Sequence, residues 1–134
     1  MNYVIVGAGP AGVIAAETLR CMDAGANIQL IGDEPEPPYS RMAIPYCLID
    51  RVTEEGTYLR KSDRHFDDLN IEVINDRVLS VSAGEGSVAL GSGTTISYDR
   101  LLVATGSTPI SPPIEGMDLP GVYPCWTLAD YRNI

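Results

Sequence analysis

The sequence has 134 residues, a net charge of −9 and a hydrophobic content of 45%, which suits one globular domain with a buried core. The acidic balance argues against nucleic acids and anionic membranes as partners, and no stretch approaches the ~18 apolar residues of a membrane span. The cysteines are widely spaced, and the first predicted strand already includes Tyr3, which leaves no signal peptide before it. We therefore expect reduced thiols and a cytoplasmic protein.

The first twelve residues carry the strongest signal. Residues 3–6 are a short apolar run, typical of a buried parallel strand. The next six residues fit the pattern G-x-G-x-x-G, and a helix is predicted directly after them. In this setting Gly7 allows a sharp turn, Gly9 lets a pyrophosphate approach the backbone, and Gly12 lets the helix pack closely. We predict a dinucleotide phosphate site formed by Gly7, Ala8, Gly9, Pro10, Ala11 and Gly12.

The predicted helix runs from Pro10 or Ala11 to Ala24, with Gly25 as its stop. Positions at helical spacing mark one face of it: Ala11, Ile14, Ala15, Thr18, Leu19 and Met22. Residues 26–31 form the second predicted strand, parallel to the first.

Two acidic residues, Asp33 and Glu34, follow the second strand. The dinucleotide fingerprint expects an acid about 20 residues after the glycines, where it binds the ribose hydroxyls. Either residue can fill this role, and its charge would repel a 2′-phosphate, which favours FAD or NAD over NADP. The loop from Glu34 to Arg41 is stiffened by prolines and can hold Arg41 against a specific ligand.

The middle of the chain is less regular. Residues 43–50 predict a short helix interrupted near Pro45, and residues 61–69 predict an amphipathic helix with Phe66 and Leu69 facing inward. His65, the single histidine, is interpreted as an ordinary surface or half-buried residue. No cluster has the spacing of metal ligands, so no metal site and no catalytic residue are predicted.

From residue 71 the pattern changes to short strands. A third strand at 71–74 is followed by segments 78–81, 87–90 and 94–97, which are separated by glycine-rich turns typical of an antiparallel meander. Residues 101–104 predict a further parallel strand, covered on both faces. It ends in Ala104, Thr105 and Gly106, small residues at which a ligand can contact the backbone. The predicted fold class is α/β, a Rossmann-like doubly wound parallel sheet with a small antiparallel insertion.

Three separated signatures, at residues 7–12, 32–41 and 98–106, together resemble the FAD-binding domain of the pyridine nucleotide-disulfide oxidoreductase family. The most similar branch contains ferredoxin and rubredoxin reductases, the flavin portion of nitrite reductase, and apoptosis-inducing factor. The resemblance implies an incomplete FAD-binding domain at residues 1–115. It implies a linker and the start of a helix at residues 116–134, leading towards an NAD(P)-binding domain that lies outside this chain.

The resemblance also implies the cofactors and their contacts. FAD would be bound here, with NAD(P)H as a co-substrate at a site outside this chain. The implied contacts are Gly7, Gly9, Pro10 and Ala11 with the pyrophosphate, Asp33 or Glu34 with the ribose, Arg41 with the cofactor, Val78 with adenine through its backbone, and Ala104, Thr105 and Gly106 beside the cofactor. Met42 stands where related enzymes carry a redox cysteine, which argues against a disulfide reductase because a thioether forms no thiolate.

The predicted function is the FAD-binding part of a flavin-dependent oxidoreductase that passes electrons from NAD(P)H to an acceptor such as an iron–sulfur protein. This chain alone is not expected to be competent. Expected partners are the remainder of the oxidoreductase or a partner chain, an electron-acceptor protein and a second copy in a homo-oligomer. Two alternatives stay open: a single-site NAD-dependent oxidoreductase, and a non-catalytic FAD-binding subunit of a larger complex.

Overall fold

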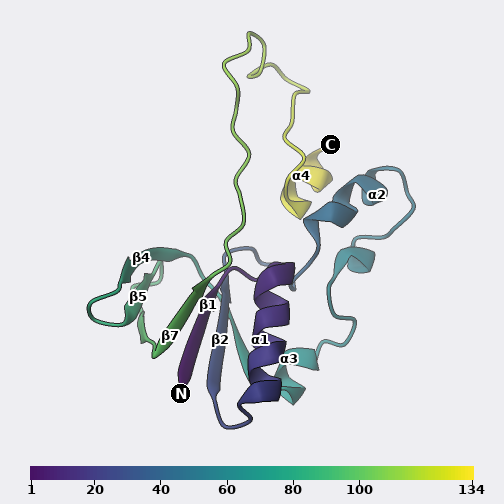
Figure 1. The fold of residues 1–134 in the computed structure, drawn as a ribbon. Coiled ribbons are helices and arrows are strands. Elements are labelled where there is room, and N and C mark those ends of the chain that lie inside the picture. The colour runs from purple at the N-terminus through teal and green to yellow at the C-terminus, as the bar shows by residue number, and fades with distance from the viewer. The chain divides into compact units, whose positions relative to one another are not determined.

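The computed structural model describes all 134 residues, and the chain folds into two compact units (Figure 1). The first unit comprises Met1–Tyr39 and Leu59–Gly106. The second comprises Ser40–Tyr58 and Ser107–Ile134. No helix combines the length and the apolar character needed to cross a bilayer.

The first unit is built on a parallel sheet with the strand order β3-β2-β1-β7. Its strands are β1 (Asn2–Val6), β2 (Asn27–Gly32), β3 (Ile71–Asn75) and β7 (Arg100–Val103). Helix α1 (Pro10–Met22) connects the parallel strands β1 and β2 and packs against both (Figure 1). This arrangement confirms the predicted Rossmann-like α/β fold.

The side chains of the sheet alternate between two cores, as the two-residue period of a strand requires. Ile5, Ile28 and Leu30 face α1 and pack with Val13 and Ala16 of that helix. Helix α3 (His65–Asp68) contributes Phe66 to the same core. The other face packs on the antiparallel sheet of β4 (Val78–Ser82), β5 (Ser87–Leu90) and β6 (Thr95–Ser97). There Val4 and Ile31 meet Val88 and Leu90, so the predicted meander is confirmed as one layer of the unit.

Helix α1 differs from its prediction at its end and on its surface. It ends at Met22 rather than Ala24, because the backbone of Asp23 is extended at φ −136° and ψ 91°. The Arg20 guanidinium hydrogen-bonds the carbonyls of Asp23 and Ala24 and those of Leu69 and Asn70. The buried face comprises Gly12, Val13 and Ala16. Ile14 and Met22 belong to the face that helical spacing predicted, but their exposed fractions are 55% and 80%.

Strand β7, which lies at the edge of the sheet, packs on a core with one face only and is not covered on both faces as predicted. Leu101 packs on the meander core. The next residue, Leu102, points to the opposite face and is 42% exposed. The helix predicted at residues 61–69 is also shorter, since α3 spans only His65–Asp68, although Phe66 and Leu69 do face inward.

The second unit contains the 3₁₀ helices η1 (Arg41–Ala43) and η2 (Glu55–Thr57) and the short helices α2 (Ile44–Leu48) and α4 (Leu128–Asn133). Its buried residues are Ile44, Cys47, Thr57 and Leu128. Arg132 of α4 donates a hydrogen bond to Glu54 at 3.0 Å, which ties the two segments of this unit together. The helix predicted at residues 43–50 is present in shorter form as α2, and the start of a helix predicted within residues 116–134 is α4.

Candidate functional site

The glycine-rich turn between β1 and α1 is held in place by its own backbone. Gly7 has φ +112°, which favours glycine, and a Cβ placed there would lie 2.3 Å from the carbonyl oxygen of Ala104. A Cβ on Gly12 would lie 1.9 Å from the carbonyl oxygen of Gly7. Both positions therefore require glycine for the packing of the protein itself.

Gly9 differs from these two glycines. Its backbone is extended at φ −77° and ψ −176°, which any residue adopts. A Cβ placed there would meet no protein atom within 4 Å. The residue lies at the N-terminus of α1, where Pro10 begins the helix and the first backbone N–H groups have no partner within it. Protein packing does not explain glycine here, whereas a ligand approaching the backbone does, so this open space fits a pyrophosphate.

The ends of three strands meet at this turn. The Gly7 N–H donates to the carbonyl of Ile31 in β2 at 2.8 Å. The Ala104 N–H donates to the carbonyl of Val6 in β1 at 2.7 Å. Gly106, the last residue of the predicted strand end, has φ +70°, and a Cβ placed there would meet no atom within 4 Å. The structure thus brings the glycine-rich turn and the Ala104–Gly106 strand end together at the carboxyl edge of the sheet, where ligands bind in open α/β folds.

The two acidic candidates have different surroundings. Asp33 directly follows β2, and its side chain is 52% exposed, with one oxygen 4.0 Å from the Arg77 Nε. The Glu34 carboxylate accepts a hydrogen bond from the hydroxyl of Tyr39, a buried residue. A Cβ on Gly32, one residue before Asp33, would lie 2.8 Å from the Ala8 Cβ. The acidic pair is therefore adjacent to the glycine-rich turn, with Asp33 the more accessible of the two.

Val78 begins β4 close to the same edge. The Asp76 N–H, two residues earlier, donates to the carbonyl of Gly32 at 2.8 Å. The Val78 side chain packs on the core between the two sheets, and the pairing of β4 with β5 is irregular between Val78 and Ser80. With its half-buried side chain packed on this core, Val78 offers mainly its backbone to a ligand.

Arg41 lies in the second unit, in η1. Its guanidinium carbon is 5.0 Å from the centroid of the Trp126 ring, a cation–π distance. Asp130 accepts hydrogen bonds from the backbone N–H groups of Trp126 and Thr127 at 2.9 and 2.8 Å. Sequence reasoning missed Trp126 and Asp130, although the T-x-x-D spacing of a capping box was there to be found.

The pattern of the family described as pyridine nucleotide-disulphide oxidoreductase matches residues 1–133. The chain belongs to this family. A rubredoxin-NAD(+) reductase of Pseudomonas putida is 32% identical over 135 residues, which cover 100% of this chain and 35% of that protein. An NADH oxidase of Methanocaldococcus jannaschii is 31% identical over 140 residues, covering 100% of this chain and 31% of that protein. The chain thus spans about a third of the length of these relatives.

Solved structures of the family have the same fold. The ferredoxin reductase for the CYP199A2 system from Rhodopseudomonas palustris superimposes with a TM-score of 0.90 at 32% identity, over 98% of this chain and 33% of that one. The predicted family and fold class are therefore confirmed.

The cysteines of this family member do not resemble a redox centre. All three are free thiols. Cys47, the one nearest to Arg41 in sequence, is buried, and its burial together with the charge of Glu54 raises the pKa of the thiol. A raised pKa opposes the thiolate that disulfide exchange requires. No group of His, Cys, Asp and Glu side chains is arranged to hold a metal ion.

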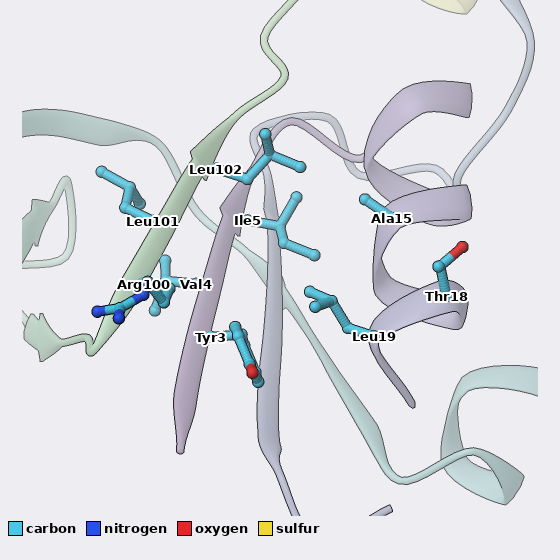
Figure 2. A pocket seen from close by; sticks show the side chains of 9 residues that line it. All are labelled: Tyr3, Val4, Ile5, Ala15, Thr18, Leu19, Arg100, Leu101 and Leu102. Atoms are coloured by element: carbon cyan, nitrogen blue, oxygen red, sulfur yellow. The ribbon is translucent and has the colours of Figure 1, made fainter. Parts of the chain in front are cut away.

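An open groove of the first unit is separate from the phosphate turn. It has a volume of about 380 Å³ and lies over the middle of β1 and β7 beside α1 (Figure 2). Ile5, Leu19 and Leu102 point into it, and most of its lining is apolar (Figure 2). This groove lies over the middle of the strands and not at their carboxyl ends, where ligands bind in open α/β folds, so we do not place the nucleotide there.

Proposed function

We propose that this chain is the FAD-binding part of a flavin-dependent oxidoreductase that takes electrons from NAD(P)H and passes them to an iron–sulfur acceptor protein. Family membership supports an oxidoreductase role, and the relatives described as rubredoxin and ferredoxin reductases support this class of acceptor. The nicotinamide site and the rest of the enzyme lie in protein outside these 134 residues, either in the same polypeptide or in a partner chain. The three free cysteines support a cytoplasmic setting.

The observation that carries the proposal is the space at Gly9, open between protein-packed glycines and next to a helix N-terminus. Gly7, Ala8, Pro10, Ala11 and Gly12 form the rest of this phosphate turn. The helix N–H groups donate to the pyrophosphate, and Gly9 admits it to the backbone. Bound FAD supplies the hydride and electron chemistry, while the protein holds and orients it.

The remaining contacts follow from the surroundings of each residue. Asp33, the more exposed acid, accepts hydrogen bonds from the adenosine ribose, and Glu34 orients the loop through Tyr39. The Val78 backbone contacts adenine, since its half-buried side chain packs on the core. Residues Ala104, Thr105 and Gly106 lie along the cofactor, and Arg41 contributes a charged contact.

Titration of the 134-residue chain with FAD tests the proposal. Flavin fluorescence quenched by the chain and restored by excess unlabelled ADP-ribose would support it, because both ligands carry the same pyrophosphate and ribose. Protection from thermal unfolding by NAD with no response to FAD would instead support a single-site NAD-dependent oxidoreductase. Adding NADH to the FAD-loaded chain is the next step. Bleaching that appears only after a partner polypeptide is added would identify a cofactor-holding module.

A further inference from the structure

The second unit holds the Arg41 side chain against the ring of Trp126, a residue from a distant part of the sequence. The guanidinium carbon of Arg41 lies 5.0 Å from the centroid of the Trp126 ring. Both residues are half-buried. Arg41 comes from the segment Ser40–Tyr58 and Trp126 from the segment Ser107–Ile134, so the contact joins the two segments of the unit.

Asp130 completes this cluster. Its Oδ2 accepts hydrogen bonds from the N–H groups of Trp126 and Thr127, and the Asp130 N–H donates to the Thr127 hydroxyl at 3.1 Å. Burial raises the pKa of the Asp130 carboxyl, but these hydrogen bonds and the charge of Arg41 hold it below its ordinary value. An ionised carboxylate therefore fixes the backbone of Trp126 and attracts Arg41.

We propose that Trp126 and Asp130 are positioning residues that hold Arg41 in the orientation in which it contacts FAD. This inference rests on the proposed function, because it takes Arg41 as a cofactor contact. A long arginine side chain loses rotamer freedom when it binds a ligand, and prior ordering removes part of that cost. Stacking on an aromatic ring engages the face of the guanidinium, while hydrogen bonding uses its edge. One side chain can therefore stack on Trp126 and bind an anion at the same time.

The first test needs no FAD. Trp126 is the single tryptophan of the chain, so tryptophan fluorescence reports on this cluster alone. If Arg41 covers the indole ring in solution, Arg41→Gln exposes it and increases the quenching of Trp126 emission by acrylamide. Arg51→Gln, which removes a nearby arginine outside the cluster, is the matched control and leaves quenching unchanged. Equal quenching in wild type and Arg41→Gln would overturn the inference.

The second test is a double-mutant cycle on FAD affinity, measured by flavin fluorescence. Trp126→Ala weakens binding by about tenfold, the scale of one cation–π contact, and Trp126→Phe restores most of the affinity because it keeps an aromatic face. In the Arg41→Gln background, Trp126→Ala has no further effect. Asp130→Asn keeps the size of the side chain and weakens binding several-fold by removing the charge. If Trp126→Ala does not fold, Asp130→Asn takes its place in the cycle.

The outcomes distinguish a failure of the positioning role of Trp126 from a failure of the proposed FAD-binding function. An equal loss from Trp126→Ala with and without Arg41 would show that Trp126 acts independently of the arginine, which overturns the positioning role alone. If the wild-type chain binds no FAD while Arg41→Gln still increases acrylamide quenching, the proposed function fails, and the positioning role toward FAD fails with it. Coupled losses, with rescue by phenylalanine, are the result that the inference requires.

Discussion

The two regions proposed to bind FAD differ in which part of the chain would contact the ligand. At the glycine-rich turn the backbone is the proposed binding surface, and the absence of a side chain at Gly9 leaves open space beside it. Around Arg41 side chains form the proposed surface, and an indole ring and a carboxylate order the charge. The first kind of site depends on open space beside the backbone, so a single added methyl group can block it. The second depends on pairwise attractions, so substitutions there reduce affinity in graded steps.

The turn itself contains two kinds of glycine. Gly7 and Gly12 are required by protein atoms that a Cβ would strike, whereas Gly9 is required only if a ligand occupies its open space. Glycine therefore has a folding role at two positions of the motif, and we propose a binding role for it at the third. Substitution of each glycine distinguishes these roles.

The largest effect is expected for Gly12→Ala. Its Cβ would lie 1.9 Å from the Gly7 carbonyl oxygen and 3.2 Å from the Leu30 Cδ1, so helix α1 must move away from the sheet. We expect a loss of about 3 kcal/mol in the free energy of unfolding, measured by urea denaturation. Gly25→Ala is the control, because its Cβ meets only the Asp23 side chain at 3.8 Å, and it changes stability by less than about 1 kcal/mol. Equal stability of the two variants would contradict the packing argument.

Gly9→Ala should have the opposite effect, with stability nearly unchanged and FAD affinity reduced. The added methyl group meets no protein atom within 4 Å, so stability changes by about 1 kcal/mol at most. The methyl group fills the space proposed for the pyrophosphate, and FAD affinity falls about tenfold or more in a flavin titration. Gly84→Ala, at an equally open glycine in a turn of the meander, leaves the affinity unchanged. A Gly9→Ala variant that binds FAD as tightly as wild type would place the phosphates elsewhere.

The acidic pair should show a smaller, chemically specific effect. Asp33→Asn removes the charged acceptor proposed for the ribose and weakens FAD binding by about 1.5 kcal/mol, roughly tenfold. Glu34→Gln, whose acid already accepts a hydrogen bond from Tyr39, has a weaker effect on affinity. Isothermal titration calorimetry of both variants compares them directly. A larger loss in Glu34→Gln would assign the ribose to Glu34.

The contrast between the two regions also explains what sequence could predict. Three local features of the sequence are the glycines themselves, their position after an apolar strand and their spacing to Asp33, so the glycine-rich turn and the parallel sheet could be predicted from them. The stack of Arg41 on Trp126 joins distant segments, and no local pattern reports it. The exposed face of α1 was missed for a related reason: spacing marks an apolar stripe, but only the neighbouring elements decide whether Ile14 is covered. Likewise, Arg20 binds carbonyls of the distant residues Leu69 and Asn70, a contact that no local pattern reports.

A further cluster of side chains stabilises the fold and contains no proposed cofactor contact, so it can be compared with the Arg41 cluster. Glu17 of α1 accepts hydrogen bonds from Arg60, at 2.6 Å to each carboxylate oxygen, and contacts the His65 Nε2 at 2.7 Å. All three groups lie in the first unit, and none is a predicted cofactor contact. The Arg60 hydrogen bond, and to a lesser degree that of His65, lowers the pKa of the Glu17 carboxyl despite its partial burial. This cluster holds the segment before α3 against α1.

The smallest effect is therefore expected for Glu17→Gln, on stability alone. Because the folded-state pKa of Glu17 lies below its ordinary value of 4.5, its contribution is present above that pH and is lost as pH falls through the folded-state value. Wild type should exceed Glu17→Gln by about 1 kcal/mol at neutral pH, and the difference should shrink below about pH 4.5 in urea denaturation at several pH values. FAD affinity stays unchanged, unlike in the Arg41 cluster. A variant that loses FAD affinity while keeping its stability would show that this cluster also positions the cofactor, and the distinction between the side-chain clusters would fail.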